Sequence, residues 1–209
     1  MSNSNPRGIV FVLSGPSGVG KDAVREPFMA VCPNLRQSIS ATTRAIREGE
    51  RDGVDYHFLT REKFEAMIEA GEFLEYTLYN GNYYGTPAPY VNALLDEGQD
   101  VLLKIEVQGA LNVKKFFPDA VLVFLLPPTM QVLWDRLTKR GTDDYEVCKG
   151  RFALAYQELG FAPQYDYVVT NGDLSETVDQ VRAIYLAEKS RIARAAYRIE
   201  TLTQEVPEL

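Results

Sequence analysis

Residues 15–22 combine glycines and a lysine at the spacing of a phosphate-binding loop. They read Gly-Pro-Ser-Gly-Val-Gly-Lys-Asp and match the pattern G-x-x-x-x-G-K-[ST] at every fixed position except the last, where Asp22 stands. Glycines let successive backbone N–H groups point at one anion, and Lys21 and a helix N-terminus add positive charge. The apolar run 8–14 before the loop is typical of a buried strand, and apolar residues at helical spacing follow it. This context favours a phosphate loop over a glycine turn that only caps a helix.

Basic residues gather in two other places, although the chain as a whole is acidic. There are 22 basic and 29 acidic residues, a formal net charge of −7, which argues against general binding to nucleic acid or to an anionic membrane. The clusters lie in residues 44–51 and 136–140. They predict local basic pockets for a small anionic ligand, with a solvated surface as the alternative for either cluster alone.

Other kinds of chemistry find little support in the composition. The single histidine, His57, and the two cysteines, Cys32 and Cys148, are too few for a disulfide framework or a four-ligand zinc site. No apolar run approaches the ~20 residues of a membrane span, and the first residues lack an apolar signal core. We therefore expect a soluble, cytoplasmic protein.

The elements that must position these residues alternate between strands and helices. Apolar runs at 101–107, 121–126 and 167–171 repeat the strand-and-helix pattern of the N-terminus, which predicts an α/β fold with a doubly wound parallel sheet. With 209 residues, 45% of them apolar, we expect one domain, its core formed by about 8–36, 87–139 and 160–198. A long helix is expected at 174–198, followed by a polar tail at 200–209 that frays.

Two segments depart from this alternation. Residues 37–86 contain short aromatic and β-branched runs typical of antiparallel strands, interrupted by a helix that ends at Gly71. We interpret them as a small mixed or antiparallel insert packed beside the sheet. Residues 140–159 begin with a polar, glycine-flanked stretch and are expected to form a helical lid.

Several motifs occur together in an order that resembles the guanylate kinase family. The resemblance begins at the phosphate loop, extends from residue 8 to about 190, and is carried by residues 40–58, 72–76, 81–86, 105–109, 136–142 and 171–174. It implies a P-loop kinase fold and transfer of the ATP γ-phosphoryl group to GMP, with Mg²⁺ as cofactor. ATP and GMP are then the expected partners.

The resemblance also assigns residues to sites. ATP is expected to contact Gly15, Pro16, Ser17, Gly18, Val19, Gly20, Lys21, Asp22 and Asn171. GMP is expected to contact Ser40, Arg44, Arg47, Tyr56, Glu75, Tyr84, Thr86 and Glu106. The expected catalytic side chains are Lys21, Arg44, Arg136, Arg140 and Arg151.

The chemistry of guanine agrees with two of these assignments. Guanine presents N1–H and N2–H donors, so its pocket should offer carboxylate acceptors, which Glu75 and Glu106 would supply. Arginine forks such as Arg44 suit a monophosphate. Taken singly, Thr86 could equally cap a helix before Pro87, and Glu75 could be an exposed strand residue.

Three residues depart from the family pattern. Asp22 replaces the usual Ser/Thr, Lys104 stands where an acidic residue is usual, and Glu106 is one methylene longer than the usual Asp. We hypothesise that the first two changes compensate one another, so that Asp22 meets Mg²⁺ directly or through water and Lys104 balances its charge. Asp22 and Lys104 should then lie within ~6 Å of each other.

Two rival functions remain at this point. One is a binding module of the same fold that has lost catalysis, although the intact loop glycines and Lys21 argue against it. The other is a phosphotransferase for a different phosphorylated acceptor, which Glu75 and Thr86 disfavour.

Overall fold

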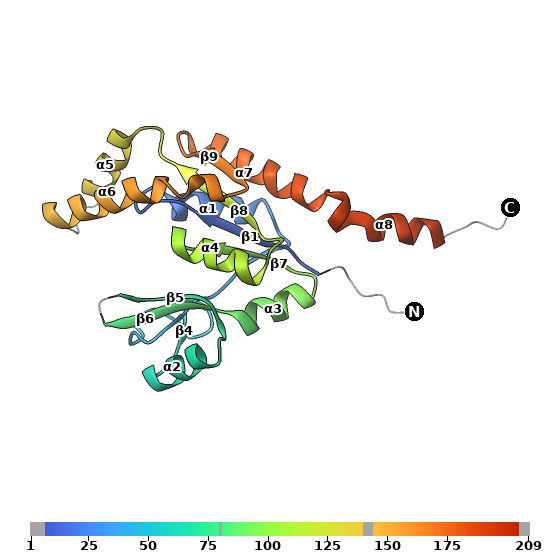
Figure 1. Ribbon diagram of the computed structural model, residues 1–209, viewed down its shortest axis with the longest axis horizontal. Coiled ribbons are helices and arrows are strands. Elements are labelled where there is room, and N and C mark those ends of the chain that lie inside the picture. The colour runs from blue at the N-terminus through green and yellow to red at the C-terminus, as the bar shows by residue number, and fades with distance from the viewer. Residues whose placement is uncertain (1–6, 80, 140–143, 205–209) are drawn as a thin grey trace.

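A five-stranded parallel sheet forms the centre of the molecule (Figure 1). The computed structural model describes residues 7–79, 81–139 and 144–204. The sheet has the order β2-β7-β1-β8-β9. Its strands are β1 (Val10–Ser14), β2 (Leu35–Gln37), β7 (Asp100–Lys104), β8 (Val121–Leu126) and β9 (Tyr167–Thr170). This confirms the predicted doubly wound α/β architecture.

Side chains of β1 alternate between two apolar layers. Phe11 and Leu13 pack with α1 (Lys21–Ala30) and α7 (Leu174–Lys189) on one face of the sheet. Val10 and Val12 pack with α3 (Ala88–Asp96) and α4 (Val107–Phe116) on the other. Because β1 is buried on both faces, the packing of this strand fixes the position of the first residues of the loop that follows it.

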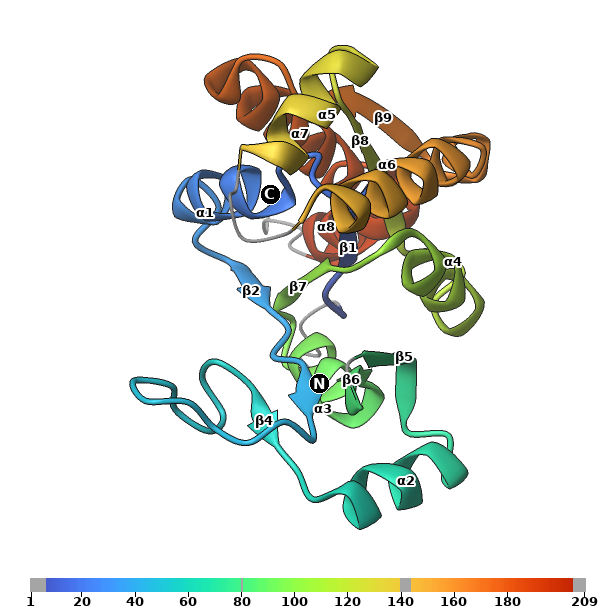
Figure 2. The same ribbon diagram turned by 90° about the vertical axis from the view of Figure 1, so that its left-hand side faces the viewer.

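The insert between β2 and α3 forms a second, mixed sheet below the first (Figures 1 and 2). Its order is β4-β3-β6-β5, with β3–β4 parallel and the other pairs antiparallel. The strands are β3 (Ala41–Thr42), β4 (His57–Phe58), β5 (Phe73–Tyr79) and β6 (Asn82–Pro87), and α2 (Arg61–Glu69) packs on them. Phe64 of α2 stacks on Phe73 with ring centroids 4.2 Å apart, which fixes the helix to the sheet.

Two helices, α5 (Met130–Thr138) and α6 (Tyr145–Leu159), lie near the carboxyl ends of the parallel strands (Figure 2). Leu133 and Leu137 of α5 pack against Ala155 of α6 in a small apolar cluster. The side chain of Asp144 accepts a hydrogen bond from the Val147 N–H and caps α6. A short 3₁₀ helix, η1 (Ala162–Gln164), leads into β9.

The C-terminal segment differs from the single helix expected at 174–198. The helix is interrupted at Ser190, and α8 (Ile192–Gln204) then projects beyond the body of the molecule (Figure 1). Glu188, only 3% exposed, binds Tyr167, Arg191 and Arg194, so a side-chain network fixes the interruption. Within the described residues α8 continues as far as Gln204, so the first part of the expected tail is helical. Among the described residues, no helix is long and apolar enough to cross a membrane.

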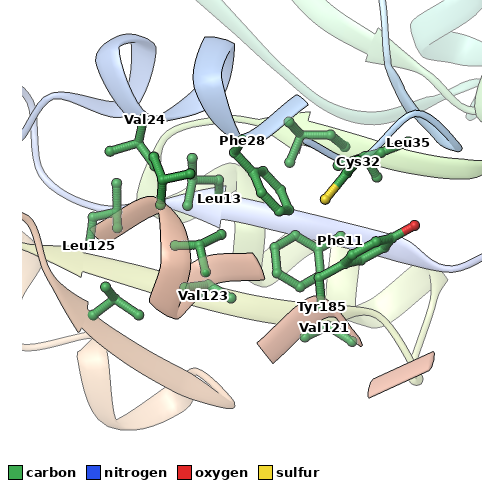
Figure 3. Close-up of a cluster of buried hydrophobic side chains, with 14 of the residues drawn as sticks. Phe11, Leu13, Val24, Phe28, Cys32, Leu35, Val121, Val123, Leu125 and Tyr185 are labelled. Atoms are coloured by element: carbon green, nitrogen blue, oxygen red, sulfur yellow. The ribbon is translucent and has the colours of Figure 1, made fainter. Parts of the chain in front are cut away.

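Phe28 tests how strongly α1 is anchored to the sheet. It is fully buried between Phe11 and Tyr185, with ring centroids 5.6 and 5.9 Å away (Figure 3). Phe28→Ala should lower the free energy of unfolding by about 3–5 kcal/mol, because it leaves a cavity in the core. Phe116→Ala, at a position 51% exposed, should cost no more than about 0.5 kcal/mol in the same urea titration. Equal losses would show that this cluster does not anchor α1.

Candidate active site

The phosphate loop leaves β1 at Ser14 and enters α1 at Lys21, at the carboxyl edge of the sheet. Gly20, the residue that precedes α1, has φ 101°, a conformation that L side chains rarely adopt. A Cβ at Gly15 would lie 2.5 Å from the Leu125 carbonyl oxygen. The glycines at these positions therefore let the chain turn tightly between strand and helix, as the motif predicts.

The Lys21 ammonium is enclosed by this loop. The side chain is 9% exposed, and Nζ donates to the Gly15 carbonyl at 2.7 Å and to the Pro16 carbonyl at 3.5 Å. Its third contact is the Glu106 carboxylate, at 2.7 Å. A residue expected to bind ATP thus contacts one expected to bind guanine.

Asp22 and Lys104, the two departures from the family pattern that were expected to lie close together, form an ion pair. Lys104 Nζ lies 2.5 Å from Asp22 Oδ1, because β7 pairs directly with β1 and Lys104 is in register with Leu13. Arg25 lies 3.8 Å from the same carboxylate. Partial burial would raise the pKa of Asp22, but the hydrogen bond and charge of Lys104, helped by Arg25 and Lys21, outweigh it and lower that pKa.

Glu75 and Thr86 face one another across the insert. Antiparallel pairing of β5 and β6 places them in register, and Thr86 Oγ1 donates to Glu75 Oε1 at 2.6 Å. Burial first, and then the nearby charge of Glu106, raise the pKa of Glu75 despite the hydrogen bonds from Thr86. A Cβ at Gly109 of α4 would lie 3.2 Å from Glu75 Oε2, so glycine leaves this carboxylate room. Thr86 does not cap the following helix, because Pro87 is the residue that precedes α3. Glu75 is not an exposed strand residue either.

Arg44 is held by a carboxylate that the sequence analysis did not single out. Its guanidinium makes two hydrogen bonds to Glu50, at 2.6 and 3.0 Å. It also lies 5.6 Å from the ring centroid of Tyr56, which in turn is 6.1 Å from that of Tyr84. Arg44, Tyr56 and Tyr84, which are expected to bind the monophosphate, therefore lie close together. The side chain of Arg47 is exposed, and its backbone N–H donates to Glu50.

A cavity of about 220 Å³ opens between the insert and the main sheet. Ser40, Tyr56, Thr86 and Lys104 are among its lining residues. The cavity thus links residues expected to bind GMP with the Asp22–Lys104 pair beside the phosphate loop.

Arg136 and Asn171 meet on the other side of the loop. Both donate to the Val19 carbonyl, Arg136 Nη1 at 2.9 Å and Asn171 Nδ2 at 2.8 Å. Arg136 Nη2 also donates to the Asn171 carbonyl at 3.0 Å. These two residues, with Gly18 and Gly20, help to line a separate cavity of about 430 Å³.

Helix α6 reaches the phosphate loop through two side chains of opposite charge. Arg151 donates to the Ser17 hydroxyl at 2.9 and 3.3 Å. Glu158 accepts from the Ser17 N–H at 3.4 Å. Arg140, the other expected cation of this segment, lies outside the described residues.

Glu50, Glu158 and Arg25 are site residues that sequence reasoning missed. Glu50 was detectable in principle, because an acid six residues after Arg44 lies within the same loop. Glu158 approaches Ser17 across 141 residues of sequence, and no local pattern indicates such a contact.

The arrangement provides two cavities, a polar one between the insert and the main sheet and a mainly apolar one beside Gly18 and Gly20 of the phosphate loop. Among residues 7–79, 81–139 and 144–204, no three His, Cys, Asp or Glu side chains group as metal ligands. The donors are instead backbone amides, one enclosed ammonium and several guanidinium groups, which suit phosphate oxygens. Such a site can bring two phosphorylated molecules together.

Comparison with known proteins agrees with this geometry. The family model for guanylate kinase matches residues 7–188. A guanylate kinase from Enterococcus faecalis is 50% identical over 201 residues, covering 96% of this chain and 98% of that protein. A guanylate kinase from Lactococcus lactis subsp. lactis is 48% identical over 200 residues, covering 96% and 98%.

A solved structure supports the same assignment. The crystal structure of guanylate kinase from Anaplasma phagocytophilum is 33% identical, covers 92% of each chain and superposes with a TM-score of 0.68. With the family model spanning most of the sequence, the chain belongs to the guanylate kinase family.

Proposed function

We propose that this protein transfers the γ-phosphoryl group of ATP to GMP, giving ADP and GDP. The observation that carries the proposal is that Glu106 contacts Lys21 of the loop at 2.7 Å and also lies close enough to Glu75 for its charge to raise the pKa of that carboxyl. Two phosphorylated substrates bound there would face each other across Lys21. The insert at 37–86 would hold the acceptor, and the segment at 140–159 would close over the donor.

Selection of guanine would depend on paired carboxylates. Glu75 and Glu106 would accept from N1–H and N2–H of guanine, and Ser40 and Thr86 would contact the base through their hydroxyls. Adenine carries a lone pair at N1 and would leave a carboxylate without a donor, which is costly in a buried pocket. Arg44, Arg47, Tyr56 and Tyr84 would bind the acceptor phosphate.

Transfer itself needs alignment and charge neutralisation more than proton removal. The second pKa of a phosphate monoester is ~6, so the attacking oxygen of GMP is largely deprotonated at neutral pH. Lys21 would bridge the β- and γ-phosphates, and Arg136 and Arg151 already contact the loop from α5 and α6. Arg140 is proposed as a further cation, and Asn171 as a contact of the adenine.

The residues at the loop fit a magnesium ion that is held mainly by the nucleotide. Asp22 offers one hard carboxylate donor, 64% exposed at the start of α1. When bound with ATP, Mg²⁺ would shield the phosphate charges, and Asp22 would contact it directly or through water. Lys104 would balance the charge of Asp22, so this pair would be neutral where the usual Ser/Thr and acidic residue together carry one negative charge.

The two rival functions fit the site less well. A non-catalytic binding module has no need for an enclosed Lys21 with three acceptors around it. A different phosphorylated acceptor, such as a ribose phosphate, would leave the half-buried Glu75 without a donor other than Thr86.

Acceptor competition tests the proposal directly. The measurement is ADP release from ATP and Mg²⁺ with GMP, AMP, CMP or UMP as acceptor. GMP should support turnover at least about 10³-fold better than AMP in kcat/KM, as expected for a site built to bind base donors. Comparable rates with all four acceptors would rule out guanine recognition, and no release with any of them would favour the binding module.

Replacing Glu75 by Gln tests the base pocket. The variant keeps the shape of the side chain but loses a charged acceptor, so kcat/KM for GMP should fall by at least about tenfold. The affinity for ATP should change little, because Glu75 contacts Thr86 rather than the loop. Unchanged GMP kinetics would place the base elsewhere.

A double-mutant cycle tests the Asp22–Lys104 compensation. Asp22→Ser should lower kcat by roughly tenfold or more, because Lys104 becomes an unbalanced cation beside the metal. Asp22→Ser combined with Lys104→Asp restores a hydroxyl and a carboxylate and should recover much of the loss. If the loss of kcat in the double variant, expressed as a free energy, equals the sum of the losses in the two single variants, the two changes do not compensate one another.

A further inference from the structure

In the free protein, the lysine of the phosphate loop already contacts Glu106, a residue proposed to bind the acceptor GMP. Lys21 Nζ has three donors, and its short contacts are the Gly15 carbonyl and Glu106 Oε2, each at 2.7 Å. Glu106 immediately precedes α4, and Lys21 is the first residue of α1, so the pair joins two elements that follow neighbouring strands. The contact therefore bridges the two proposed nucleotide sites.

Each substrate would need one partner of this pair. The ATP phosphates need the ammonium of Lys21, and guanine needs the carboxylate of Glu106. The substrate that binds first must break the ion pair between Lys21 and Glu106. The second substrate then binds a residue that has already been released from this pair. A contact that both ligands break gives positive coupling, and the coupling factor must be the same in either direction.

We propose, on the basis of the function proposed above, that Glu106 is a positioning residue for Lys21 and couples ATP binding to GMP binding. In the free protein Glu106 keeps the ammonium at the mouth of the loop and balances its charge. When ATP draws Lys21 to its phosphates, the Glu106 carboxylate becomes available to guanine. The two sites then favour the state in which both substrates are bound.

The size of the effect follows from the exposure of the two partners. The Lys21 side chain is 9% exposed but that of Glu106 is 67% exposed, so water screens the pair and its contribution is modest. We expect a coupling factor of roughly fivefold, at the low end of the usual range for linked sites.

Calorimetric titration of three proteins tests the proposal: the wild type, Glu106→Gln and Glu75→Gln. MgATP alone is titrated first, without GMP, so that no turnover occurs. Glu106→Gln should bind MgATP about fivefold more tightly than the wild type, because no ion pair has to be broken. Glu75→Gln removes the other proposed guanine acceptor but does not contact Lys21, and its affinity for MgATP should stay within about twofold of the wild type.

GMP is then titrated with and without the unreactive β,γ-imido analogue of ATP. The analogue should tighten GMP binding about fivefold in the wild type and in Glu75→Gln, but not in Glu106→Gln. Simple removal of a negative charge near the loop would raise MgATP affinity without abolishing this coupling. Glu106 is exposed, so its replacement is not expected to disturb folding.

The results separate this proposal from the proposed function. If Glu106→Gln binds MgATP no more tightly than the wild type, or shows the same coupling, Glu106 does not control Lys21. If the wild type fails to bind GMP at all, the proposed function falls, and the MgATP titrations still decide whether Glu106 holds the lysine.

Discussion

The enclosed ammonium of Lys21 is the charge around which the rest of the site is arranged. It is held by the Gly15 carbonyl because the loop turns back on itself, and the loop can turn because glycine stands at positions 15 and 20. The Val19 carbonyl, next to Gly20, accepts hydrogen bonds from Arg136 and Asn171. Strand β1, buried on both faces, fixes the start of this arrangement.

An acidic protein keeps these cations in place by pairing them with carboxylates. Lys21 binds Glu106, Lys104 binds Asp22, and Arg44 binds Glu50. Each pair restrains a long basic side chain in the free protein, which would lower the ordering cost of binding at the proposed sites. If these residues bind the substrates as proposed, the same pairs also oppose binding, because an incoming phosphate or base would have to displace a carboxylate or share its partner. The proposed coupling between the two substrates would follow from that exchange.

Local patterns predicted the parts of this structure that neighbouring residues determine. The strand, loop and helix around Lys21, the parallel sheet and the mixed insert are confirmed, because apolar periodicity and glycine spacing act over short distances. The proximity of Asp22 and Lys104 was also predictable, since strand order in such sheets fixes which residues meet. Glu158 was not, because its contact with Ser17 depends on how α6 packs over the loop. The interruption of the C-terminal helix at Ser190 depends on a buried Glu188 whose partners come from β9, from the turn between α7 and α8, and from α8.

A crystal structure with GMP and an unreactive ATP analogue bound together would test the central role of Lys21 most directly. We predict that Lys21 Nζ lies at hydrogen-bond distance, ~3 Å, from phosphate oxygens, while Glu106 has left it and accepts from the guanine edge. A complex in which Lys21 and Glu106 keep their contact with both nucleotides present, or in which guanine lies away from Glu75 and Glu106, would contradict the account.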